Sequence, residues 1–226
     1  MNNETHYLGH RSRLRTRFLQ AEDSHTPDYE LLELILFAAK PRGDAKPLAK
    51  RLLKTFGSFD KVIYADETSL RAVEEVGDAV VATLKTVRVG AQRMLRSEIS
   101  DKPIIQTWSA LMDYCRLKIG RNKIEEFHVL FLNNKHALIA DELMQRGTIN
   151  HASVYPREII KRALEVSASA IILLHNHPSG DLTPSKGDIE VTQKIVEAAK
   201  AVGIAVHDHV IITEHGNYSF KSFGLL

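Results

Sequence analysis

The sequence AIILLHNHPSGDLTPSKGD, residues 170–188, decides how we interpret this chain. A short aliphatic run, 170–174, is followed directly by His175 and His177. Such a run, bounded by turn residues, predicts a buried strand. Side chains two residues apart in a strand point to the same side, so both histidines are expected to face one way at its carboxyl end. Ligands collect at that edge of α/β sheets, and two imidazoles there can share a metal ion.

The residues after the histidines offer a third ligand. Pro178 to Pro184 predict a loop that sets the next helix beside the histidines, with Asp188 in its first turn. A catalytic zinc takes three protein ligands and one open position, so we expect His175, His177 and Asp188 to bind it. Ser185 has two interpretations: a helix N-cap in a capping box with Asp188, or a hydroxyl directed at a developing oxyanion. We expect these to conflict, because a carboxylate that binds zinc should not also cap the helix.

Strands and helices alternate through the rest of the C-terminal part, 104–226, which predicts an α/β layer domain. We expect helices at 108–117, 157–167 and 189–202, and strands at 127–132, 137–144, 170–174 and 204–213. The last strand contains His207, Asp208 and His209. Its two histidines are expected to share one side. Asp208 and His209 are candidates for contact with the metal ligands, with Asp208 orienting a ligand histidine.

The N-terminal part, 1–98, is predicted to be helical and to form its own domain. Capping residues, proline and glycine delimit helices at 29–39, 46–56, 59–64, 70–76 and 78–95. The polar segment 97–103 ends in proline and is the predicted domain boundary.

Composition excludes several classes of protein. The 226 residues are 44% hydrophobic and 26% charged, as in ordinary globular proteins. No apolar run is long enough to span a bilayer, and the first residues lack a signal-peptide core, so we expect a cytoplasmic location without membrane contact. One cysteine, Cys115, excludes an internal disulfide and a four-cysteine zinc site. Cys115 and Trp108 are expected to be core residues.

The net charge of +2 is small, but basic residues cluster in the N-terminal part. Such clusters form either a solvated helix face or a surface for phosphate backbone. DNA association through this domain is therefore an expectation from charge alone. Its candidate contacts are Arg11, Arg13, Lys46, Lys50 and Arg51.

Longer patterns resemble a known family. The spacing His175-x-His177-x7-Ser185-x2-Asp188 matches the metal-binding motif of the JAMM (MPN+) metallopeptidases. The surrounding HNHPSGD, the YPRE at 155–158 and the DHVII at 208–212 resemble the bacterial RadC-like proteins. Upstream, GHRSRLRTRF and PDYELLELILF resemble the N-terminal region of the same family, so the resemblance covers nearly the whole chain.

This resemblance implies a mixed sheet flanked by helices, similar to the cytidine-deaminase core, preceded by an all-α domain with a helix-hairpin-helix-like module. It implies one Zn²⁺ per chain, held by the two histidines and the aspartate, with Ser185 as oxyanion helper. A glutamate acts as general base: the family's Glu-x-Phe pattern favours Glu125, with Glu126 in reserve. The implied reaction is hydrolysis of an amide or isopeptide bond in a peptide or protein. The hairpin departs from the family's Gly-x-Gly, because Glu75 replaces the first glycine.

Two other classes of zinc hydrolase can be excluded. The sequence contains no His-Glu-x-x-His and no Pro-Cys-x-x-Cys, which excludes two other classes of zinc hydrolase. Two alternatives stay open. One is a DNA-associated accessory protein, traditionally labelled DNA repair, whose JAMM-like domain binds metal without physiological cleavage. The other is a metal-dependent nuclease. The substrate and the oligomeric state are not predicted.

Overall fold

The computed structural model describes residues 9–20, 26–100, 102–147 and 154–226. The chain folds into two compact units, residues 1–91 and 92–226. Helix α6, Asp78–Ser100, contains the point of division. Across the described residues, every helix is too short or too polar to cross a membrane.

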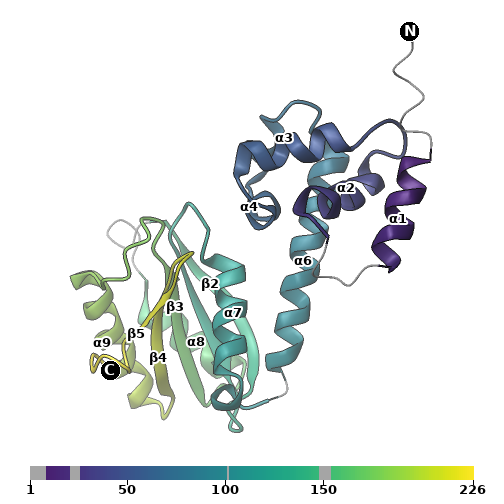
Figure 1. Ribbon diagram of the computed structural model, residues 1–226. Coiled ribbons are helices and arrows are strands. Elements are labelled where there is room, and N and C mark those ends of the chain that lie inside the picture. The colour runs from purple at the N-terminus through teal and green to yellow at the C-terminus, as the bar shows by residue number, and fades with distance from the viewer. Residues whose placement is uncertain (1–8, 21–25, 101, 148–153) are drawn as a thin grey trace. The chain divides into compact units, whose positions relative to one another are not determined.

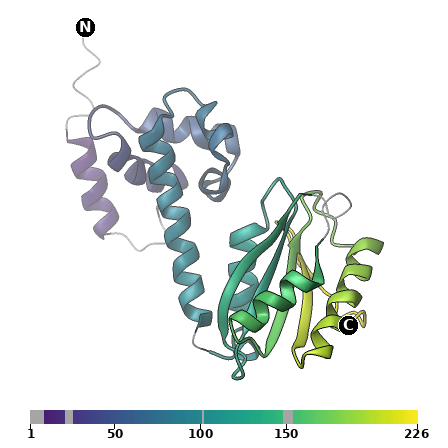
Figure 2. The ribbon, with the colours of Figure 1, turned by 180° about the vertical axis from the view of Figure 1, so that it is seen from behind.

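The first unit is helical (Figure 2). Its helices before α6 are α1 His10–Gln20, α2 Asp28–Ala39, α3 Lys46–Phe56, α4 Phe59–Tyr64 and α5 Glu67–Arg71. Leu32 and Leu36 of α2 and Leu48 and Leu52 of α3 are fully buried at its centre. Their spacing of four residues places each pair on one helix face, which explains why the two helices pack together.

One short helix differs from its prediction. The helix expected at 70–76 is α5, which begins at Glu67 because the Asp66 carboxylate caps it by accepting from Ser69 N at 2.8 Å. Residues 72–77 form turns instead. Glu75 has a φ of 69°, a left-handed conformation that favours glycine. Glu75, which stands where the family has its first hairpin glycine, thus adopts a backbone conformation typical of glycine.

The second unit contains one five-stranded sheet (Figure 1). Its strands are β1 Glu126–Leu132, β2 Leu138–Arg146, β3 Ala170–Asn176, β4 Ala205–Ile212 and β5 Asn217–Ser219, in the order β2-β1-β3-β4-β5. Only β3 and β4 are parallel; the other pairs are antiparallel. The helices of this unit are a 3-10 turn Ile104–Gln106, α7 Trp108–Ile119, α8 Pro156–Glu165 and α9 Lys186–Ala201.

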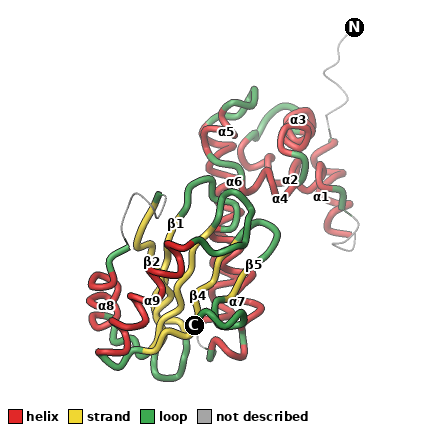
Figure 3. Tube along the Cα trace, turned by 90° about the vertical axis from the view of Figure 1, so that its left-hand side faces the viewer, coloured by secondary structure: helices red, strands yellow, loops and turns green. Residues whose placement is uncertain are grey.

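Helices cover both faces of the sheet (Figure 3). On one face α7 packs on Leu130 and Leu174, and on the other α8 and α9 pack on Val129 and Leu173. Neighbouring residues of a strand thus enter different cores, as the alternation of side chains requires. The predicted fold class, a helical region followed by a mixed sheet flanked by helices, is confirmed.

Several features were not predicted, among them helix α1, which lies before the first expected helix. Strand β5 was missed, because Asn217–Ser219 is too short to show a period. Helix α6 continues to Ser100, since Ile99 is fully buried in the core beside α7. Finally, β4 is irregular: Ile171 pairs with Val206 but Ile172 with Asp208, which leaves His207 as an extra residue. The predicted domain limits, 1–98 and 104–226, stay a prediction.

Candidate metal centre

Four of the predicted site residues come together at one edge of the sheet. One ligand atom from each of Glu125, His175, His177 and Asp188 lies within 4.8 Å of the others. His175 and Asp188 are buried, and Glu125 and His177 are partly exposed. The two Nε2 atoms of the histidines are 2.9 Å apart. The carboxylate of Asp188 lies 3.3 Å from Nε2 of His175 and 3.5 Å from Nε2 of His177.

The local fold explains this convergence. His175 is near the end of β3 and His177 follows the strand, so the period of two places both on the α9 side. Phe127 of β1 pairs with His175, and its ring stacks on the imidazole with centroids 6.1 Å apart. Glu125 lies two residues before Phe127 and therefore faces the same side. Asp188 enters from the first turn of α9.

The hydrogen-bond partner of His177 determines which ring nitrogen carries a hydrogen. Its Nδ1 lies 2.6 Å from the carbonyl oxygen of Asp181. Because a carbonyl oxygen only accepts, Nδ1 must donate, and the neutral ring presents a lone pair at Nε2.

A longer chain of hydrogen bonds orients His175. The Thr192 hydroxyl donates to the carbonyl oxygen of Asp188 at 2.5 Å. Its oxygen is then free to accept from Nδ1 of His209, also at 2.5 Å. Nε2 of His209 must therefore accept from Nδ1 of His175 at 2.8 Å, which leaves Nε2 of His175 with a lone pair. His209 is neutral in this arrangement, and burial lowers the pKa of this fully buried histidine well below its usual value.

The inner surface of the group therefore presents only electron pairs: two imidazole nitrogens and the oxygens of Asp188. Such atoms repel one another unless a cation lies between them. A proton can take the place of such a cation: a hydrogen bond to Asp188 raises the pKa of His177 against the effect of burial. For Asp188, burial acts to raise the pKa, but the neighbouring imidazoles and the bond from Ser185 outweigh it and lower the pKa. Two histidines and one carboxylate are a donor set that fits zinc.

The capping box and the metal-facing position of Asp188 do not conflict, contrary to the expectation from sequence. Oδ2 of Asp188 accepts from Ser185 N and Ser185 Oγ, both at 2.7 Å, and Asp188 N donates to Ser185 Oγ at 3.1 Å. Oδ1 meanwhile lies near His175. The expectation was wrong because a carboxylate has two oxygens. The Ser185 hydroxyl hydrogen is thus directed to Asp188, and an oxyanion role for Ser185 stays a prediction.

The two glutamates before β1 lie in different surroundings. Glu125 lines a cleft of about 560 Å³ together with His177, Pro178 and Thr183. The Glu126 carboxylate instead contacts Asn122 at 2.8 Å, His128 at 3.2 Å and Arg146 at 3.3 Å. Only Glu125 combines proximity to the histidines with access to a cleft that can admit a substrate.

His207 and His209 of β4 lie on opposite faces of the sheet, although the sequence predicted that they share one side. His209 contacts His175, whereas His207 contacts His136 at 2.6 Å on the α7 side. The extra residue in β4 is the physical reason, since a bulge changes the alternation. Asp208 does not orient a ligand histidine through its carboxylate. That carboxylate accepts from Ser219 Oγ at 2.5 Å and from the backbone of Lys221 and His209.

The chain is similar to known proteins over most of its length. The family model of the RadC-like JAB domain matches residues 105–225. The chain belongs to this family. It is 53% identical to a UPF0758 protein of Rhodobacter capsulatus over 94% of this chain and the whole of that protein. A UPF0758 protein of Ruegeria pomeroyi is 49% identical over 96% of this chain and 97% of its own length. Those names state no activity.

Two residues of the JAB domain that support the site were missed at the sequence level. Thr192 lies four residues after Asp188, a spacing that places both on one helix face. Asn176 lies between the two histidines and is fully buried. Its Oδ1 accepts from Glu126 N at 2.8 Å, and its Nδ2 donates to the carbonyls of Asn122 and Ile124, both at 3.1 Å. Asn176 thereby fixes the backbone on both sides of Glu125.

Replacement of Asn176 by alanine should be strongly destabilising. It leaves one backbone N–H and two carbonyls without their side-chain partner, and we expect a loss of about 2–3 kcal/mol in the free energy of unfolding. Urea unfolding measures this loss. The matched control is Asn217→Ala at an exposed position of β5, with an expected change within about 0.5 kcal/mol. Equal effects of the two substitutions would contradict this role of Asn176.

Replacement of Thr192 by valine removes the acceptor for Nδ1 of His209 with little change of shape. His209 then no longer has a fixed tautomer, and His175 loses its orientation. We expect zinc affinity to fall by about 10–100-fold, the usual effect of losing a partner of a metal ligand. Competition with a fluorescent chelator measures it. Thr192→Ser keeps the hydroxyl and should retain most of the affinity; an equal loss in both variants would rule out the hydrogen-bond chain.

The predicted nucleic-acid contacts lie in the helical unit, and several of them already bind protein groups. Arg11 donates to the carbonyls of Lys40, Pro41 and Gly43 at 2.5–3.0 Å. Arg51 contacts Glu75 at 3.0 Å. The remaining three are differently placed: Lys46 and Lys50 lie over the ring of Tyr29, and Arg13 is exposed. DNA contact by these residues stays a prediction.

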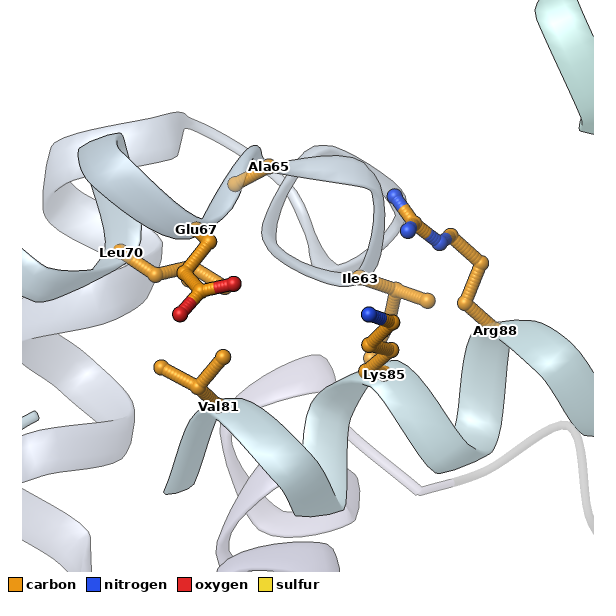
Figure 4. A pocket seen from close by; sticks show the side chains of 7 residues that line it. All are labelled: Ile63, Ala65, Glu67, Leu70, Val81, Lys85 and Arg88. Atoms are coloured by element: carbon orange, nitrogen blue, oxygen red, sulfur yellow. The ribbon is translucent and has the colours of Figure 1, made fainter. Parts of the chain in front are cut away.

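A small pocket in the same unit does not strengthen that prediction. Lys85 and Arg88 of α6 and Glu67 of α5 surround it, over Leu70 and Val81 (Figure 4). Its volume is about 50 Å³, which is room for a few water molecules and not for a nucleotide.

Proposed function

We propose that the JAB domain is a zinc-dependent hydrolase that cleaves an amide or isopeptide bond in a peptide or protein. The observation that carries the proposal is the convergence of Glu125 with His175, His177 and Asp188 beside an open cleft. His175, His177 and Asp188 would hold the ion. When bound, zinc supplies Lewis-acid chemistry, which activates a water molecule and polarises a carbonyl.

The protein side chains would supply the proton transfer and the positioning of the ligands. Glu125 would take a proton from the attacking water and return it to the leaving nitrogen, the usual work of a general acid–base. Ser185 holds Asp188 in place through Oδ2, and the chain from Thr192 through His209 holds His175. The cleft lined by Ile124, Pro178 and Thr183 supplies the surface on which an extended substrate can lie beside Glu125.

The proposal is tested with the full chain after reconstitution with zinc. Libraries of linear peptides and of lysine-branched isopeptides are incubated with it, and the products are identified by mass spectrometry. We expect cleavage at a defined amide bond that disappears when a chelator removes zinc and returns when zinc is restored. Absence of cleavage in both libraries, with zinc bound, would contradict the proposal and favour a non-hydrolytic accessory role.

A further inference from the structure

A second pair of histidines meets on the opposite face of the sheet from the metal centre. Nδ1 of His136 lies 2.6 Å from Nε2 of His207, and the ring centroids are 4.6 Å apart. His136 is in the turn between β1 and β2, and His207 is in β4, so the two come from distant parts of the chain. Both are partly exposed.

Two backbone irregularities bring this pair together. His136 has a φ of 59°, a left-handed conformation that is unfavourable for a residue with a side chain. His207 is the extra residue of the β4 irregularity, which turns its ring to the α7 side. Each feature costs free energy, and both kinds of irregularity are over-represented at functional sites. Together they bring two imidazoles into contact that strand alternation alone would keep apart.

The pair lies in the wall of a pocket of about 350 Å³, a volume within the range of small-molecule sites. Ile104, Trp108 and Ile172 give it an apolar lining, and Lys221 and Ser222 add polar groups. Trp108 was expected to be a core residue, but it is only partly buried.

The accessible charged group of the pocket, Lys221, favours an anion, whereas the Asp208 carboxylate in its wall is buried. The Lys221 side chain is exposed at the pocket and is a positive neighbour of His207. The Asp208 carboxylate in the wall already accepts from Ser219 and from the backbone of Lys221 and His209. A metal ion would therefore find two imidazoles beside an ammonium group, which is a poor donor set. An anion would find an ammonium and an imidazole N–H, which form charge-assisted hydrogen bonds.

We propose that this pocket binds a small carboxylate with an apolar body, its carboxylate at Lys221 and the His136–His207 pair and its body against Trp108 and Ile172. The ligand is a free acid of the size of a naphthoate. This site is distinct from the metal centre, and its existence does not depend on hydrolysis.

The chain has a single tryptophan, Trp108, so its fluorescence reports directly on this pocket. The full chain is titrated with naphthoate and with naphthamide, which has the same rings without the charge. We expect saturable quenching by naphthoate with an affinity at least about tenfold higher than that of naphthamide, since a charged hydrogen-bond partner is lost in the amide. Lys221→Gln should lower the naphthoate affinity about tenfold, whereas Lys200→Gln, at an exposed position of α9, should not change it.

His136→Asn removes the imidazole but keeps a residue that tolerates the left-handed backbone, and it should also weaken naphthoate binding. Thermal unfolding confirms that each variant is folded. Equal affinities for acid and amide, an unchanged affinity in Lys221→Gln, or no saturable binding up to on the order of 10 mM would overturn the proposal. The carboxyl terminus of a peptide offers the same chemistry, so a tripeptide ending in phenylalanine is titrated in parallel. Tighter binding of that peptide than of naphthoate would overturn the assignment to a free acid.

Discussion

Glu125→Gln is expected to lower the rate of hydrolysis by about 10²–10⁴-fold, the contribution of a positioned general base, while zinc stays bound. Glutamine has the shape of glutamate but cannot take up the proton of the attacking water. The three proposed zinc ligands and the hydrogen-bond chain behind His175 do not involve the Glu125 carboxylate, so metal affinity should change little. Steady-state rates on a cleaved peptide and zinc content by elemental analysis measure the two effects separately.

Glu126→Gln is the matched control for this experiment. Its carboxylate contacts Asn122, His128 and Arg146 and does not belong to the group of four around the two histidines. We expect its effect on the rate to be below about tenfold. Full activity in Glu125→Gln would contradict the hydrolase mechanism. If a cellular phenotype survives Glu125→Gln but is lost on charge reversal at the exposed Arg13 and Lys50, the DNA-associated accessory hypothesis is favoured instead.

Asp188→Asn is expected to lower zinc affinity by more than about 100-fold, beyond the loss typical of a residue that only supports a ligand. The substitution removes the one negative charge among the three proposed zinc ligands. Because the asparagine oxygen can still accept from Ser185, the cap of α9 should persist, and the metal-free variant should unfold within about 1 kcal/mol of the wild type. Chelator competition and urea unfolding separate loss of metal from loss of fold.

Asp113→Asn makes the same chemical change at an exposed position of α7, on the other face of the sheet. Its zinc affinity should equal that of the wild type. If Asp188→Asn binds zinc as tightly as Asp113→Asn does, then Asp188 is not a ligand, and its place in the structure is that of a helix cap alone.

Much of the site follows from local periodicity. The period of two in a strand was enough to expect His175 and His177 on one side, and their Nε2 atoms indeed meet at 2.9 Å. Helix α3 has the predicted bounds because proline near its start and Gly57 after its end are strong local signals. These are properties of short segments, which a single sequence contains.

Other features depend on distant parts of the chain. The separation of His207 from His209 comes from a bulge opposite β3, and a bulge leaves no mark on the apolar pattern of β4. The orientation of Glu125 follows from the pairing of Phe127 with His175 across two strands, which sequence spacing alone does not give. The roles of Thr192 and Asn176 require knowledge of which carbonyls and rings they meet. Sequence analysis therefore proposed the ligands but not the groups that hold them.

The metal content of the purified protein shows whether the four residues around His175 bind zinc. The full chain is stripped with a chelator, incubated with excess zinc, passed through a desalting column and examined by elemental analysis. The four-residue group predicts about one zinc per chain in the wild type and in Glu125→Gln, with loss in Asp188→Asn and His177→Ala. Retention of no zinc by the folded wild-type chain would contradict the account, because the electron pairs of His175, His177 and Asp188 would then meet without the ion that we propose joins them.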